Sequence, residues 1–198
     1  ELITLLDNAP RFFRRALDPV VGLCVAIVDA QPPLERETIF LAVDLLIAIA
    51  ERIPSAARRS RTYLSSLIPM ALRMLLQVEE RDLESWNNAE GEVAEDMTIF
   101  DLAKDCLDRV SLALGGKAVY AETFSSGLLH SWLQSDDWRM RHAALSCIAQ
   151  VAEGCKYQML EDLEALVSEV VSRFDDEHPR VRWAAINAMG QMETGLGA

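Results

Sequence analysis

The acidic side chains are the candidate functional groups of this chain, because of their number and their spacing. Residues 79–96 contain eight acids and one base, so this segment carries −7 of the chain's net charge of −12. Like charges at this density repel one another and favour an extended segment that a cation or a basic protein would neutralise. The acids are Glu79, Glu80, Asp82, Glu84, Glu90, Glu92, Glu95 and Asp96, and Trp86 lies in the middle of the segment.

Two interpretations of residues 79–96 stay open. The segment is either a solvated loop without a partner or an electrostatic docking loop for a basic protein. Trp86 is unusual in a purely solvated loop. It would either anchor the loop to the rest of the fold or contact the partner.

A second group of acids falls in residues 157–174, where the periodicity is helical. The apolar face of this helix is predicted to consist of Leu160, Leu163, Val167, Val170, Val171 and Phe174. The acids Glu161, Asp162, Glu164 and Glu169 lie largely off that face. They would either line an inner surface and bind an extended basic peptide, or form an ordinary solvated face.

No motif typical of catalysis or metal binding stands out. The sequence has no Gly-rich phosphate loop, GxSxG elbow, HExxH motif or calcium-binding loop. His130, His142 and His178 are scattered and have no clustered acid or thiol, which argues against a zinc site. We therefore expect a protein-binding protein rather than an enzyme, with no metal and no cofactor.

The amino-acid composition further narrows the class of protein to which this chain can belong. The 198 residues are 51% hydrophobic, so the chain can bury a core without disulfide or metal support. Its net negative charge opposes nucleic acid binding, and its longest apolar run, Val20–Val28, is too short to cross a bilayer. The cysteines form no CxxC pair and lie among apolar residues, as expected of reduced core residues inside a cell. They are Cys24, Cys106, Cys147 and Cys155.

Apolar residues recur at steps of three and four along most of the chain, and no stretch alternates like a β-strand. The fold is therefore predicted to be all-α. Gly115 and Gly154 each follow a helical run, where a left-handed C-cap is expected. Residues 1–7 look like the end of one helix. The other predicted helices are 11–30, 35–53, 63–78, 98–113, 118–134, 137–153, 157–174 and 178–193.

Four columns of mostly apolar residues repeat along the chain. Successive members of every column are 61, 41 and 41 residues apart, and the four positions within a unit share one helix face. The 20 additional residues of the first offset coincide with the acidic segment. The columns are Ala42, Ala103, Ala144, Ala185; Leu45, Cys106, Cys147, Ala188; Leu46, Leu107, Ile148, Met189; and Ile49, Val110, Val151, Met192.

A helical hairpin of about 41 residues that stacks on its neighbours is the unit of HEAT and armadillo solenoids. We therefore predict an α-α superhelix of about four hairpins, and expect the chain to be a segment of a longer one. The predicted divisions are a partial repeat at 1–30, a repeat at 34–78, the acidic loop at 79–97, repeats at 98–134 and 137–174, and a partial repeat at 178–198.

The last two units share a local signature, because residues 136–144 (DDWRMRHAA) align with residues 177–185 (EHPRVRWAA). The acid before each helix is expected to cap its N-terminus. Arg141 and Arg182 are expected to pair with an acid of a neighbouring unit. We interpret both arginines as structural.

Three stretches resemble the middle HEAT repeats of the importin-beta superfamily, in particular its importin-5 (karyopherin beta-3) branch. They are residues 106–117 (CLDRVSLALGGK), 138–155 (ending in IAQVAEGC) and 178–192 (HPRVRWAAINAMGQM). The family has an acidic loop where this chain has residues 79–96. The acids of that family loop form a continuous run, whereas Asn87, Asn88, Ala89 and Gly91 interrupt them here.

The resemblance implies a nuclear transport receptor that shuttles between cytoplasm and nucleus. Such receptors bind basic cargo signals on the concave face, Ran-GTP through N-terminal repeats and the acidic loop, and Phe-Gly nucleoporins on the convex face. By position, residues 79–96 would sense Ran or cargo, and the acids of helix 157–174 would contact cargo. Neither nucleic acid binding nor membrane insertion is implied. The alternative is a generic HEAT scaffold of the phosphatase-regulatory or coat-adaptor type, which would lack the three stretches.

Overall fold

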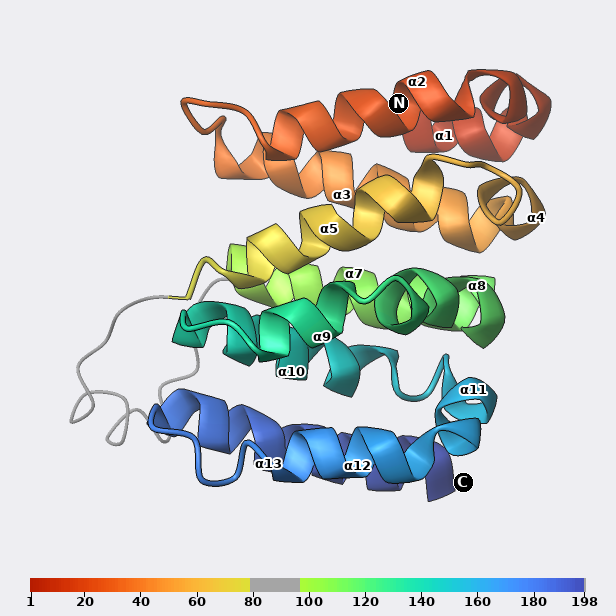
Figure 1. The fold of residues 1–198 in the computed structure, drawn as a ribbon. Coiled ribbons are helices and arrows are strands. Elements are labelled where there is room, and N and C mark those ends of the chain that lie inside the picture. Colours follow the sequence, from red (N-terminus) through yellow and green to blue (C-terminus); the bar gives the residue numbers. More distant parts are fainter. Residues whose placement is uncertain (79–96, 198) are drawn as a thin grey trace.

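The computed structural model describes residues 1–78 and 97–197, and the regular structure within them is entirely helical. Antiparallel helices form hairpins that stack from the N-terminus to the C-terminus (Figure 1). The elements are α1 (Leu2–Asn8), α2 (Pro10–Val28), α3 (Arg36–Arg52), α4 (Pro54–Ala57), α5 (Tyr63–Leu75), α7 (Ile99–Leu114), α8 (Gly116–Tyr120), the π-helix η1 (Ala121–Ser125), α9 (Leu128–Leu133), α10 (Trp138–Val151), α11 (Lys156–Glu161), α12 (Leu163–Val171) and α13 (Pro179–Gly197).

The helices form two layers. α1, α3, α7, α10 and α13 make the first layer, in which each helix packs on the next. α2, α5, the α8–η1–α9 segment and the α11–α12 segment make the second layer (Figure 1). This arrangement confirms the predicted all-α solenoid of HEAT type. Within the described residues, no helix is long and apolar enough to span a membrane.

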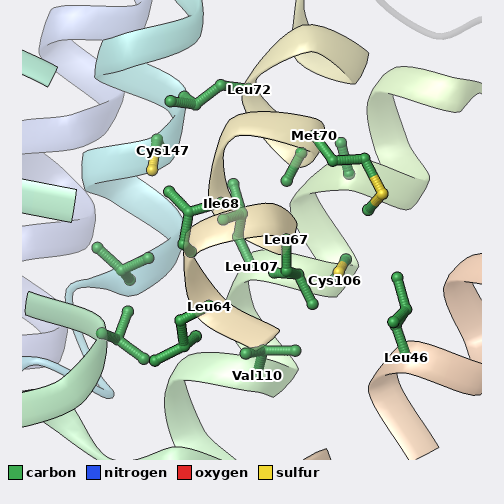
Figure 2. Close-up of a cluster of buried hydrophobic side chains, with 14 of the residues drawn as sticks. Leu46, Leu64, Leu67, Ile68, Met70, Leu72, Cys106, Leu107, Val110 and Cys147 are labelled. Atoms are coloured by element: carbon green, nitrogen blue, oxygen red, sulfur yellow. The ribbon is translucent and has the colours of Figure 1, made fainter. Parts of the chain in front are cut away.

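The core runs between the layers and through all the hairpins. The residues of the four predicted columns are buried, except for Met189, which is partly buried. Figure 2 shows how Leu46 of α3, Leu67 of α5, Leu107 of α7 and Cys147 of α10 belong to one apolar cluster. Small residues in the first column allow close helix approach, and larger ones fill the seams.

The four cysteines are buried and free, as expected of core residues. Burial raises the pKa of the Cys24 thiol to about 11 and the pKa of the Cys106 and Cys155 thiols to about 12. These side chains therefore stay protonated and pack as small apolar groups.

Two second-layer helices are broken where the sequence predicts continuous ones. The 118–134 helix is interrupted by η1 and by Gly127, whose φ is +76°. The 157–174 helix breaks at Asp162, which has φ −111° and ψ 19°. Because this break shifts the helical phase, the predicted apolar face is wrong at two positions: Leu160 is 43% exposed and Val171 42% exposed.

Neither glycine forms the predicted left-handed C-cap. Gly115 has a positive φ of 77°, but its ψ of 157° lies outside the left-handed helical region. Gly154 has no positive φ, so the predicted cap is wrong there. Gly154 lacks a side chain for a packing reason, since a Cβ at this position would overlap the side chain and backbone of Ser111.

Arg141 links adjacent hairpins, as predicted. Its Nε and Nη2 donate to the two carboxylate oxygens of Asp176 at 2.8 and 2.9 Å. Arg182 lies at the equivalent position, but its Nη1 donates to the carbonyl oxygens of Asp176 and Glu177 in its own unit. Asp137 caps α10, and the backbone N–H of His178 donates to Asp176 rather than to the predicted Glu177.

Candidate partner-binding surface

The first predicted site lies outside the described residues. Its members are Glu79, Glu80, Asp82, Glu84, Trp86, Glu90, Glu92, Glu95 and Asp96. The second predicted site lies in the second layer. Glu161, Asp162 and Glu164 lie at the junction of α11 and α12, and Glu169 lies in the last turn of α12.

Asp162 faces the preceding hairpin. Its Oδ2 accepts a hydrogen bond of 2.5 Å from the hydroxyl of Tyr120, the last residue of α8. Burial raises the pKa of Tyr120, and the bond to the Asp162 carboxylate raises it further, so the phenol keeps its proton. The break in the helix at Asp162 thus positions a carboxylate against a fixed donor.

Glu169 is held in a similar way, about two helical turns further along. Its Oε1 accepts a 3.1 Å hydrogen bond from Nε2 of Gln134 and lies 3.3 Å from Nδ1 of His130. Both partners come from α9 and its C-cap. The side chain of Glu169 is 27% exposed, so part of its carboxylate remains accessible to a ligand.

A depression of about 220 Å³ lies between these two carboxylates. The rings of Tyr120 and Phe124 stack along it, with centroids 4.6 Å apart and an interplanar angle of 22°. Apolar side chains from α9, α10 and α12 complete its lining. The full lining is Tyr120, Phe124, Leu129, His130, Leu133, Ile148, Asp162, Ala165, Leu166 and Glu169.

This lining matches the chemistry of a basic side chain. Lysine and arginine have an apolar stem that packs on aliphatic surface and a cation that favours carboxylates and aromatic faces. The volume is below that of typical small-molecule cofactor sites, which occupy roughly 300–1,000 Å³. We refer to this depression as the basic-residue pocket.

The structure brings two of the predicted acids together and separates the other two. Asp162 and Glu169 line the basic-residue pocket, whereas Glu161 and Glu164 are exposed and do not line it. The sequence interpretation missed the aromatic pair and the two residues that hold Glu169. A signal was available, because Tyr120 and Asp162 are 42 residues apart, close to the repeat period of 41.

The described residues contain no group of three or more His, Cys, Asp or Glu side chains that could hold a metal ion. Two of the histidines lie instead in an aromatic cluster between hairpins. The rings of Trp138 and His178 stack with centroids 3.8 Å apart, and His142 lies against Trp138 and Phe100.

Two families match this chain. The importin repeat family matches residues 29–121, and the HEAT-like repeat family matches residues 138–192. Together these matches take in most of the chain.

Curated relatives point the same way. The chain is 29% identical over 198 residues to importin subunit beta-3 of Saccharomyces cerevisiae, a match that covers 98% of this chain and 18% of the relative. It is 25% identical over 174 residues to a probable importin-5 homolog of Dictyostelium discoideum, with 84% of this chain and 15% of the relative covered.

Solved structures agree with these relatives. Kap121p bound to Pho4p superimposes with a TM-score of 0.89 at 28% identity, covering 100% of this chain and 19% of Kap121p. Kap121p bound to RanGTP gives a TM-score of 0.88 at 28% identity, covering 98% of this chain and 19% of Kap121p. The chain thus spans less than a fifth of the length of these relatives. With its stacked hairpins, its 41-residue period and these matches, the chain is similar to a segment of the HEAT repeats of the importin-beta superfamily.

Proposed function

We propose that the chain is part of a nuclear import receptor and that its second layer binds a basic segment of the cargo. The observation that carries the proposal is the basic-residue pocket, where Asp162 and Glu169 meet the stacked rings of Tyr120 and Phe124. The relatives support it, because Kap121p has been solved bound to Pho4p, Ste12p and other proteins.

The pocket would bind and orient a basic side chain and would not catalyse a reaction. A lysine stem packs on Leu133 and Leu166, and its ammonium group lies between the two carboxylates. Because Tyr120 holds Asp162 in place, little side-chain entropy remains to be lost on binding. In this proposal the receptor segment is a binding module rather than an enzyme.

Acids outside the pocket contribute at longer range. Glu161 and Glu164 are exposed beside it, and residues 79–96 add seven net negative charges. Such a field raises the association rate of basic segments and disfavours acidic ones. Residues 79–96 serve as a docking loop for basic cargo or for Ran in this proposal.

The other partners follow from the superfamily. Kap121p has been solved bound to RanGTP and to Nup53p. We infer that the receptor containing this segment binds Ran-GTP and Phe-Gly nucleoporins and shuttles between cytoplasm and nucleus. Release of cargo would follow a change in superhelix curvature when Ran competes for the receptor.

The test uses a fluorescein-labelled Lys-rich peptide and fluorescence anisotropy at 50 and 150 mM salt. Asp162→Asn/Glu169→Gln removes both pocket charges, and Glu37→Gln/Glu193→Gln removes two exposed charges from the first layer. We expect the pocket variant to lose roughly 10–150-fold in affinity, since hydrogen bonds to charged groups contribute about 1.5–3 kcal/mol. The control variant should change less than twofold, and equal losses in both variants would contradict the proposal.

A further inference from the structure

A surface of opposite charge lies near the start of the chain. Six of the chain's 19 basic side chains fall in two short segments, the first turns of α2 and the turn between α4 and α5. The only acid in residues 10–19 and 54–62 is Asp18. The six side chains are Arg11, Arg14, Arg15, Arg58, Arg59 and Arg61, and we call them the arginine surface.

The two segments face each other across a depression of about 280 Å³, which Arg14, Arg15 and Arg59 line. Asp18 also lines it, but its Oδ1 already accepts hydrogen bonds from the hydroxyls of Ser60 and Thr62 at 2.7 and 2.8 Å. These bonds lower the pKa of Asp18 and tie α2 to the turn. Asp18 therefore fixes the geometry of the surface more than it neutralises the arginines.

Most of these arginine side chains do not stabilise the described part of the fold through a hydrogen bond or an ion pair. Nη1 of Arg58 donates to the carbonyl oxygen of Leu114 at 2.8 Å. The side chains of the other five are exposed and make no hydrogen bond or ion pair with residues 1–78 or 97–197. Arginines elsewhere behave differently, as Arg109 and Arg141 each pair with acids of a neighbouring hairpin.

The position of the cluster is unfavourable for the fold. The N-terminus of α2 has no acid in its first turn and no side-chain cap, so the positive end of the helix dipole faces three cations. Arg11 also lies three and four residues before Arg14 and Arg15, where like charges repel. Local stability therefore does not account for this surface, and a ligand of opposite charge would.

We propose that the arginine surface binds an acidic segment of another protein, at a site separate from the basic-residue pocket. Guanidinium groups match carboxylates in a two-pronged geometry, and Phe12, 57% exposed in their midst, offers an apolar contact. The cations are spread over two segments around a shallow depression, which suits several carboxylates on an extended chain better than one anion. The chain's net charge of −12 opposes nucleic acid, whose charge density is far higher.

The experiment measures the anisotropy of a fluorescein-labelled 12-residue peptide of alternating Glu and Ser at 50 mM salt. Arg15→Glu/Arg59→Glu reverses two charges of the surface, and Lys117→Glu/Lys156→Glu makes the same change in net charge elsewhere. We expect the arginine variant to lose at least tenfold in affinity and the lysine variant less than threefold. Similar losses in both variants, or no binding by the unaltered chain, would overturn the proposal.

A stability control and two further binding measurements separate an acidic protein from the alternative explanations. Removal of a repelling cation from the start of α2 should leave the Tm of Arg15→Glu/Arg59→Glu unchanged or raised, so lost binding cannot be ascribed to unfolding. If a 12-nucleotide single-stranded DNA binds more tightly than the peptide through the same arginines, the partner is a nucleic acid and not an acidic protein. If 5 mM inorganic phosphate displaces the peptide, the surface binds small anions in general and not an acidic protein segment. Either result would refute the proposed partner.

Discussion

Replacing Asp176 with asparagine should weaken the docking of α13 on α10. The side chains of Arg141 and Asp176 are 6% and 4% exposed and form two parallel hydrogen bonds. Removing one partner of a buried ion pair leaves the other charge uncompensated, which costs about 3–5 kcal/mol. The carbonyl oxygens of Ser135 and Asp136 still accept from Nη1 of Arg141, so we expect about 3 kcal/mol for Asp176→Asn.

Urea unfolding followed by circular dichroism measures this loss. Asp176→Asn, Arg141→Met and the double variant form a cycle in which we expect a coupling of about 2 kcal/mol. Glu177→Gln is the control, because Glu177 lies 3.3 Å from the same guanidinium but its side chain is 83% exposed. We expect it to cost less than about 0.5 kcal/mol. A cost below about 1 kcal/mol for Asp176→Asn, or additive single effects, would refute the reasoning.

The pH dependence gives a second readout of the same pair. Burial raises the pKa of Asp176, but hydrogen bonds from Arg141 and from the backbone N–H of His178 outweigh it, and the pKa is lowered. A lowered folded-state pKa contributes stability above the unfolded value of about 3.9, and this contribution is lost as the pH falls through the folded value. The difference between the original chain and Asp176→Asn should therefore be full at pH 7 and shrink below about pH 4.

Three other changes test separate parts of the fold by urea unfolding. Gly154→Ala should cost about 1–3 kcal/mol because its Cβ would overlap Ser111, and no measurable cost would contradict that close contact. Thr98→Ala should cost about 1 kcal/mol through loss of the capping box of α7, whereas Thr98→Ser should keep most of it. Burial and then nearby cations lower the pKa of His142 to about 4, so its contribution is present above the unfolded value of about 6.5 and lost as the pH falls. Between pH 7 and pH 4 the chain should lose about 3 kcal/mol more than His142→Leu, and parallel losses would show that His142 is not the titrating group.

The first layer could be predicted because its sequence pattern and its packing obey the same rule. Ala103 and Ala144 lie 41 residues apart in the sequence and both are fully buried, as are Cys106 and Cys147. Each first-layer helix packs on the equivalent helix of the next repeat. Residues on the same helix face therefore recur at the repeat period. Met189 of α13 departs from this pattern, since it is only partly buried.

The second layer could be predicted only in part. The apolar steps of residues 118–134 continue through Gly127, yet the backbone breaks there. The break at Asp162 has no turn-forming glycine or proline beside it. The hydrogen bond between Asp162 and Tyr120 joins two hairpins, and such a contact is invisible to periodicity within one helix. The acids were therefore identified from the sequence, but their grouping into one pocket required the stacking of the hairpins.

Asp162 and Glu169 are proposed to hold the cation of one basic side chain. Titration calorimetry can test it by comparing a Lys-rich peptide with the same peptide carrying acetyl-lysine, because acetylation removes the charge and keeps the stem. Acetylation should lower affinity at least tenfold for the original chain and less than threefold for Asp162→Asn/Glu169→Gln. An equal effect of acetylation on both proteins would contradict the claim.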